Sequence, residues 1–516
     1  MQTRPLTRMW IFSFFVLCYF LPHMAVAGDF MDVRLSFKFF DDDFLHDSKD
    51  GSPGIEFGRD DYLLPSEAFG SKYTGRETQA RLVLYKKLDD LWPRLVTEAA
   101  IVLRYNVFVP ESGKASNAAV GVEDDGSYIR VAYAFDDSKK PPSLALVLFP
   151  FSSDRFRLGY TYDITWGGPD AFIEAQRVRP TTGAKLEYKN GENYAFVGAK
   201  STEVNVKRIG QGEISTPEVR WGGLAGGGYD ILDMVLLEAG CGYFNRGAFT
   251  RENPVMGKPM HSWGISARAT YHLGQKVGLP VDFRLYRNNP EAIEEAVKPE
   301  KQASFGLMAG IEYTHLEQVL IDPVVSGGTS WQPANAGNIF MRLRLWNFRV
   351  TLDMVYRDVA FLQFDQPSFE TETDFHPDFK LKPELFAVAG VDYHFESIHV
   401  TPGLLLSYQR PASVSLPSLK TEGMQPIEKP TVVVRNRGDW DILPAGDSVT
   451  AILSSKLTLK VQLSSMLTVL AEAYLAIDNN KTRYTLKGGD SNPATWTRIY
   501  QDPYIFGAGI IFFAKF

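Results

Sequence analysis

Stretches in which apolar and polar residues alternate recur along the whole of this 516-residue chain. Successive side chains of a strand point to opposite faces, so each stretch predicts a β-strand with one apolar and one polar face. The pattern fits the strands of a transmembrane barrel, but also an exported sandwich or propeller whose sheets have one wet face. The stretches lie at 33–39, 156–165, 263–273, 305–313, 348–356, 387–395, 457–463 and 467–477.

The last thirteen residues predict a strand that is suited to a bilayer. The odd positions include Gly507, Gly509 and Lys515, which suit a polar lumen. The apolar face is about as long as a tilted strand needs to cross a membrane. Every backbone group must be paired in lipid, so such a strand implies a closed barrel; a buried strand of a soluble sandwich is the alternative. The apolar even positions are Tyr504, Phe506, Ala508, Ile510, Phe512, Ala514 and Phe516.

An apolar final strand that ends on phenylalanine resembles the C-terminal strand of Gram-negative outer-membrane β-barrels. The resemblance implies an all-β fold, a transmembrane antiparallel β-barrel over residues 28–516, in the outer membrane. It also implies that Phe516 is part of the membrane-insertion signal, which the barrel-assembly machinery of that membrane would recognise. The resemblance is one of architecture, and no motif identifies a subfamily.

Residues 1–27 have the layout of a secretory signal peptide. Arg4 and Arg8 precede an apolar stretch at 10–21, and residues 25–27 read Ala-Val-Ala, a cleavage site of the A-x-A type. Cleavage after this site removes two arginines and no acid, so 52 basic and 61 acidic residues remain, a net charge of −9. Cleavage would also leave one cysteine, Cys241, and no cysteine at the new N-terminus, which argues against a lipoprotein.

The composition of the exported part excludes several classes of protein. Beyond the signal peptide, no uncharged apolar run approaches twenty residues, so no helical membrane span is predicted. The negative charge and the absence of a basic stripe argue against a nucleic-acid partner. No linker or low-complexity segment divides the chain, and the first predicted strand follows the signal almost directly, so neither a plug nor a periplasmic domain is expected.

Short and long connections between the predicted strands alternate, as expected when turns lie in the periplasm and loops lie outside. Short ones occur at Asn347, 396–399 and 464–466, and long ones at 358–383 and 409–447, among others. The number of strands depends on whether 143–149 is a separate strand, which gives 20, or not, which gives 19. We predict about 18 strands, within a range of 16 to 20.

A barrel of this size leaves an aqueous lumen, so the predicted function is a porin-like channel for passive diffusion of small hydrophilic solutes or ions. The charged residues opposite the apolar faces are candidates to line the pore, and their mixed signs predict weak selectivity, tilted slightly toward anions. General porins fold their third loop inward after the fifth strand, and residues 166–183 are similar in placement if 143–149 is not a spanning strand. The pore-lining candidates are Arg104, Arg130, Arg157, Asp163, Arg268, Arg342, Arg344 and Asp353, and the constriction-loop candidates are Asp170, Glu174, Arg177 and Arg179.

Two other functions are compatible with parts of the sequence. The alternative is a barrel subunit or scaffold of a surface or polysaccharide-export machine, which would bind protein partners through its loops. An enzyme is not predicted. Residues 374–376 (Asp-Phe-His) and 439–441 (Asp-Trp-Asp) resemble the Asp-x-His and Asp-x-Asp pairs of outer-membrane proteases, but the two pairs occur in the reverse order along this chain.

No cofactor or metal is predicted. The acidic residues of 41–61 suit a solvated loop near lipopolysaccharide better than a calcium site. The glycine run at 222–228 predicts a bend or close packing against Trp221 and Tyr229. The expected partners are the lipid bilayer, lipopolysaccharide and the assembly machinery, and the sequence leaves the solute and the oligomeric state open.

Overall fold

The computed structural model describes the greater part of the chain that follows the predicted signal peptide. That peptide, residues 1–27, lies outside the described residues. Within the described part, no helix is long and apolar enough to span a membrane. The described residues are 31–41, 76–108, 121–124, 126–138, 141–150, 157–161, 164, 166–167, 182–207, 215–249, 254–274, 277, 305–363, 372–419, 427–428, 430–436, 439–487 and 495–516.

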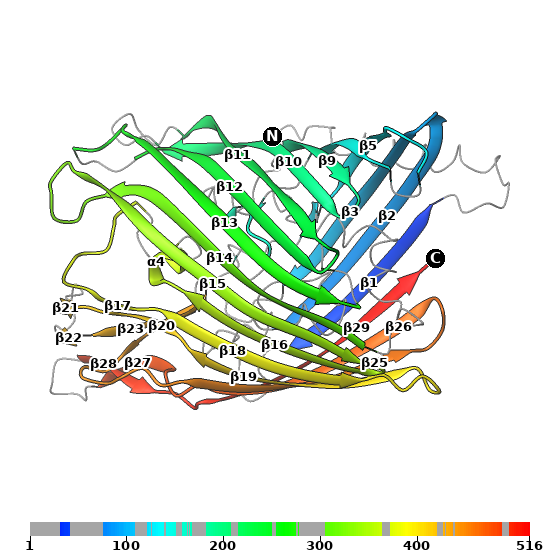
Figure 1. Ribbon diagram of the computed structural model, residues 1–516. Coiled ribbons are helices and arrows are strands. Elements are labelled where there is room, and N and C mark those ends of the chain that lie inside the picture. Colours follow the sequence, from blue (N-terminus) through cyan, green and yellow to red (C-terminus); the bar gives the residue numbers. More distant parts are fainter. Residues whose placement is uncertain are drawn as a thin grey trace, which may run out of the picture.

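Antiparallel strands form one closed barrel, in which each strand pairs with the next along the chain (Figure 1). Of the nineteen strands in this sheet, β4 and β5 pair with successive stretches of β3 and act as one interrupted strand, so the wall has eighteen. This confirms the predicted fold and strand number. The wall consists of β1 (Asp32–Asp41), β2 (Arg76–Trp92), β3 (Leu95–Phe108), β4 (Gly121–Asp124) with β5 (Tyr128–Ala134), β6 (Ser143–Phe149), β9 (Thr182–Asn190), β10 (Asn193–Lys207), β11 (Ser215–Ile231), β12 (Val235–Ala248), β13 (Pro259–Leu273), β14 (Phe305–Ile321), β15 (Thr329–Leu345), β16 (Phe348–Arg357), β18 (Glu384–Tyr393), β19 (Val400–Arg410), β25 (Ile452–Gln462), β26 (Leu467–Ile477) and β29 (Tyr504–Lys515).

The first and last strands close the barrel. β1 pairs antiparallel with β29, from Arg34 opposite Lys515 to Asp41 opposite Ala508, and the two lie side by side in Figure 1. The backbone N–H of Phe516 donates to the carbonyl of Val33 at 2.9 Å. Every wall strand therefore has a neighbour on both sides, as a strand in lipid requires.

The wall is apolar outside and polar inside. On β13, Ile265 is 48% exposed, whereas its neighbours Ser266 and Arg268 are 2% and 8% exposed. In a soluble protein the exposed side chain of such a strand would be the polar one. The side of the wall that carries the large apolar residues therefore faces lipid, and the polar side faces the lumen.

The connections at the two ends of the barrel differ in length. Tight turns join β11 to β12 and β15 to β16, where Leu232, Asp233 and Trp346 have positive φ angles of 57°, 51° and 49°. Both termini of the wall lie at the end with these turns, which is the periplasmic end by the usual rule. Most long connections lie at the other, outer end, among them the one between β16 and β18. The connection between β13 and β14 is an exception, because Leu273 and Phe305, which it joins, both lie at the periplasmic end.

The outer end also carries small sheets that the sequence patterns did not predict. Four strands form the larger one, and two hairpins accompany it. Its apolar core includes Val414, Val434 and Ile442. The buried Arg435 ties it together, pairing with Asp441 at 2.8 Å and with Asp478. The strands are β17 (Lys380–Lys382), β20 (Ala412–Ser415), β23 (Thr431–Asn436) and β24 (Asp439–Leu443), with hairpins β21 (Ser418–Leu419) and β22 (Ile427–Glu428), and β27 (Thr482–Lys487) and β28 (Thr495–Tyr500).

The prediction of a strand at 156–165 is wrong. Among the described residues of this range, the strand is limited to Arg157–Leu158 (β7), which pairs with Trp166–Gly167 (β8) outside the wall. Ser143–Phe149 is instead the fifth strand of the wall, paired with β5 and β9. The described residues 158–161 are all buried, at both phases of the alternation, so the pattern does not correspond here to a strand with one polar face.

Candidate functional site

The described residues between β6 and β9, namely 157–161, 164 and 166–167, fold into the barrel; they are called the inward segment below. Leu158 packs against the glycines of the wall: a Cβ atom placed on Gly264 would lie 3.0 Å from the Leu158 side chain, and one on Gly240 would lie 3.6 Å from it. Small residues on β12 and β13 thus make room for the segment. It follows the fifth strand, the position at which general porins fold a loop inward.

A carboxylate on β14 holds the inward segment to the wall. The backbone N–H groups of Tyr160 and Thr161 each donate to the Glu312 carboxylate at 2.7 Å, one to each oxygen. Glu312 is 1% exposed. Hydrogen bonds to a charged group are stronger than neutral ones, about 1.5–3 kcal/mol each. The wall therefore holds the backbone of the segment.

Next to this contact, a buried ion pair spans β12 and β13. The Arg268 guanidinium lies 2.5 Å from Glu238 Oε2, and the Tyr194 hydroxyl donates to Glu238 at 2.7 Å. The same guanidinium lies 5.1 Å from the centre of the Tyr160 ring, within reach of a cation–π interaction. Arg268, predicted as a pore-lining residue, thus lies inside the barrel and contacts the inward segment.

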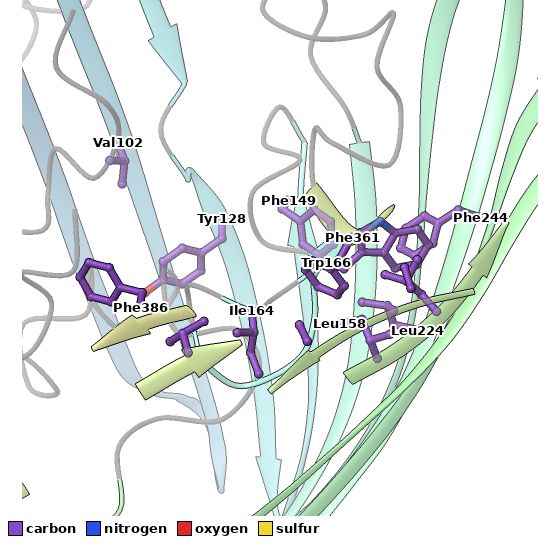
Figure 2. Close-up of a cluster of buried hydrophobic side chains, with 14 of the residues drawn as sticks. Val102, Tyr128, Phe149, Leu158, Ile164, Trp166, Leu224, Phe244, Phe361 and Phe386 are labelled. Atoms are coloured by element: carbon purple, nitrogen blue, oxygen red, sulfur yellow. The ribbon is translucent and has the colours of Figure 1, made fainter. Parts of the chain in front are cut away.

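A cluster of buried apolar side chains also joins the inward segment to the wall (Figure 2). Trp166 meets Phe244 of β12 edge to face, with ring centres 4.5 Å apart. Ile164 and Leu158 join the same buried cluster. Phe361 also joins it from α4 (Val359–Gln363), the short helix after β16, so two connections reach into the barrel at this level.

The glycine run on β11 serves this packing. A Cβ atom on Gly222 would lie 2.4 Å from the Phe244 ring, and one on Gly228 would lie 2.4 Å from the Tyr194 ring. Close packing of aromatic rings on these glycines was predicted, but against Trp221 and Tyr229. Those two residues have odd numbers and face outward, so the rings that need the space are the inward-facing ones.

Two more predicted pore-lining arginines lie on the inner face with carboxylate partners. Arg130 on β5 lies 3.4 Å from Glu98 of β3. Arg342 on β15 lies 2.9 Å from Asp353 of β16, itself a predicted residue. The structure thus brings these predicted charges together in pairs across neighbouring strands.

The other predicted pore-lining residues have different positions. Arg344 lies near the periplasmic turn, where its Nε is 3.5 Å from the carbonyl of Trp346. Arg157 is half-buried in the inward segment and so is not on the wall. Arg104 lies in β3, but its side chain is outside the described part of the structure, as is the whole of Asp163.

The predicted constriction-loop residues fall in a part of the chain about which the structure gives no description. These are Asp170, Glu174, Arg177 and Arg179. The described residues that contact the wall lie upstream of them. Sequence reasoning placed the start of the loop too late because it assigned 156–165 to the wall.

The residue pairs that resemble protease motifs are engaged elsewhere. Asp374 accepts hydrogen bonds from Ser330 at 2.8 Å and from Gln332 at 2.6 Å. Asp441 pairs with Arg435 in the outer sheet. Each carboxylate thus has a structural partner of its own.

The outward face of β14 shows how deep the wall sits in the membrane. From the periplasmic end it reads Phe305, Leu307, Ala309, Ile311 and Tyr313, and then becomes polar. An apolar band bounded by aromatic residues is typical of the interfaces of a bilayer. The protein is a β-barrel of the outer membrane.

Comparison with known proteins adds only a general likeness. No family model matches the chain, and no curated protein matches its sequence. Among solved structures it is similar to OpdQ of Pseudomonas aeruginosa, with 10% identity, 94% of this chain and 97% of that chain covered, and a TM-score of 0.42. It is also similar to a BenF-like porin from Pseudomonas fluorescens Pf-5, with 8% identity, 94% of this chain and 98% of that chain covered, and a TM-score of 0.43. For OccAB2 of Acinetobacter baumannii the identity is 10%, the coverage is 95% of this chain and 98% of that chain, and the TM-score is 0.42. At such values the likeness carries no argument about this chain.

Proposed function

We propose that the protein is a channel through which small hydrophilic solutes or ions cross the outer membrane by passive diffusion. The observation that carries the proposal is the inward segment, which is fixed to the lumen wall by Glu312. Barrels of 16–18 strands are wide enough to hold an aqueous channel, and a segment folded into the lumen narrows it. We propose this level as the constriction, with one side formed by the inward segment.

The charges of the lumen support weak selectivity. Arg268 pairs with Glu238, Arg342 with Asp353, and Lys456 with Glu472 at 2.9 Å. A neutralised pair presents little net field to a passing ion, so such pairs discriminate little between cations and anions. Because Arg130 also pairs with Glu98, the described arginines of the lumen do not carry the slight preference for anions that their number in the sequence predicts.

Conductance in a planar bilayer tests the channel. Purified protein should give stepwise increases in current, and a salt gradient should give a small reversal potential. The rival proposal is a scaffold of a surface or export machine, whose outer sheets would bind protein partners. Silent bilayers, together with partner proteins that co-purify from the native membrane, would favour that rival. The same purification gives the oligomeric state, for which we make no proposal.

A further inference from the structure

The outward face of the barrel becomes polar near the outer ends of β14, β15 and β16. On β14 the apolar run ends at Tyr313 and is followed by His315 and Glu317. On β15 the apolar outward positions give way to Asn335, and Asp358 directly follows the last residue of β16. These positions are adjacent, since Asn335 pairs with His315 in the barrel register.

The polar side chains at this place form one connected set, the outer polar cluster, made of Tyr313, His315, Asn335, Tyr356 and Asp358. The Tyr313 hydroxyl donates to Asn335 Oδ1 at 2.6 Å, and His315 Nδ1 lies 2.9 Å from the same oxygen. The Asn335 amide donates to Asp358 at 2.8 Å, and the Tyr356 hydroxyl donates to Asp358 at 2.5 Å. The cluster is thus ordered before any ligand arrives.

An aromatic row borders the cluster. Trp221, Tyr243, His261 and Trp331 follow one another across β11 to β15, with successive ring centres 5.4, 5.8 and 5.2 Å apart. Trp331 is 50% exposed and Tyr313 is 51% exposed. Flat exposed rings beside amide, carboxylate and hydroxyl groups offer a stacking surface together with hydrogen-bonding partners.

The charge of this surface limits what it binds. No lysine or arginine lies at an outward position of β13, β14, β15 or β16, whereas Glu317 and Asp358 bring carboxylates. At these strand positions a phosphate would meet acids, and Lys258, the exposed lysine that directly precedes β13, donates to the Gly327 carbonyl at 3.0 Å. Sugar hydroxyls both donate and accept, and so they suit acids, an amide and aromatic rings.

We propose that the outer polar cluster and the aromatic row bind the sugar head group of a glycolipid in the outer leaflet, the layer of lipopolysaccharide. Sugar hydroxyls would bond to Asn335, Asp358 and Glu317, and a sugar ring would stack on an exposed ring of the row. The site goes beyond the proposed channel, because it lies on the outside of the wall and needs no open lumen.

Binding of lipopolysaccharide to the detergent-solubilised full chain tests the site. The probe is purified lipopolysaccharide with a short sugar core, titrated by native mass spectrometry, with phosphatidylethanolamine as the comparison lipid. Asn335→Leu removes the centre of the cluster and should weaken lipopolysaccharide binding by about tenfold or more, equal to about 1.4 kcal/mol. Tyr313→Phe removes one hydroxyl and should weaken it by roughly threefold.

The matched control is Phe348→Leu, at the periplasmic end of the outward face of β16, where the proposal expects lipopolysaccharide binding to stay within about twofold of wild type. Equal affinity in Asn335→Leu and in this control would overturn the site. So would equal binding of phosphatidylethanolamine, which would make the surface an ordinary interfacial girdle, or loss of binding in EDTA, which would mean phosphate contact through a divalent cation. A change in oligomeric size in Asn335→Leu would mean that a second copy occupies the surface.

The folding and the conductance of the variants are measured separately from lipopolysaccharide binding. Both variants should migrate as folded, heat-modifiable barrels, and Tyr313→Phe covers the case in which Asn335→Leu does not fold. The conductance of Asn335→Leu should equal that of the wild type. Loss of lipopolysaccharide binding with conduction unchanged thus supports the site, whereas silent wild-type protein that still binds contradicts only the channel.

Discussion

At the scale of single residues, the contact between Glu312 and the inward segment joins positions about 150 residues apart in the sequence. The alternation on β14 predicts that Glu312 faces the lumen, and it does. No pattern predicts that two consecutive backbone amides, those of Tyr160 and Thr161, will meet it. Such a partner depends on the path of a connection, which short-range periodicity does not encode.

Glu312→Gln should loosen the inward segment. The amide side chain has one acceptor oxygen and no charge, so one backbone N–H would face a donor. A loss of about 1.5–3 kcal/mol of anchoring corresponds to a roughly tenfold to hundredfold larger population of detached segment. Single-channel recording should show this as added current noise and flicker. Glu472→Gln, which changes a wall carboxylate paired with Lys456, is the control; equal noise in both variants would refute the anchoring role.

Two wall glycines that flank Leu158 should respond differently to a methyl group. A Cβ atom on Gly264 would lie 2.9 Å from the carbonyl oxygen of His315, tighter than real contacts allow, whereas one on Gly240 would meet nothing nearer than 3.4 Å. Gly264→Ala should therefore destabilise the barrel by about 1–3 kcal/mol. Gly240→Ala should change stability little. The midpoint of urea unfolding measures both, and a similar midpoint in the two variants would contradict the packing described.

At the scale of elements, eight of the nine alternating segments, the final one included, lie in strands of the wall, and 156–165 does not. An alternating segment is extended with one face buried, but the pattern does not say what pairs with its backbone. Of the described residues at 156–165, only Arg157 and Leu158 are in a strand, and Thr161 is buried as well as Leu158, Tyr160 and Ile164. The outer sheet was missed for a related reason: its strands, such as Ala412–Ser415, are too short for periodicity to register.

The turn between β11 and β12 is a place where the backbone conformation does not suit the residue. Leu232 has φ 57° and is 85% exposed. A left-handed conformation costs a leucine about 1–2 kcal/mol, and asparagine tolerates it better. Leu232→Asn should thus stabilise the folded barrel by about 0.5–1 kcal/mol in urea unfolding. Met234→Asn, in the same turn without a positive φ, should give no gain; a gain there would point to solubility instead.

At the scale of the whole molecule, closure depends on the two ends of the chain. Phe516 exchanges backbone hydrogen bonds with Val33, at 2.9 Å from its N–H and at 3.3 Å to its carbonyl. The sequence predicted the last strand from its alternation and its final aromatic residue. The predicted first strand at 33–39 proved to be its partner, so the closure of the barrel was predictable from the two ends.

Deletion of Phe516 should lower the amount of folded barrel in the outer membrane while signal cleavage continues. The deletion removes two closing hydrogen bonds and the terminal ring that we propose the assembly machinery recognises. Heat-modifiable protein in membrane fractions measures assembly, and the size of the chain reports cleavage. Phe516→Tyr keeps an aromatic ring and should assemble normally. Normal assembly of the deletion would show that the terminal ring is dispensable.

The way in which the inward segment is held has a consequence for how such a barrel diversifies. Glu312 grips main-chain amides, which every residue except proline supplies. The two hydrogen bonds to Glu312 therefore do not depend on the side chains at 160 and 161, whereas the packing of Leu158 and Trp166 depends on theirs. New permeation properties can therefore arise by substitution at positions of the segment whose side chains do not pack on the wall, while the eighteen strands and the Glu312 contact stay as they are.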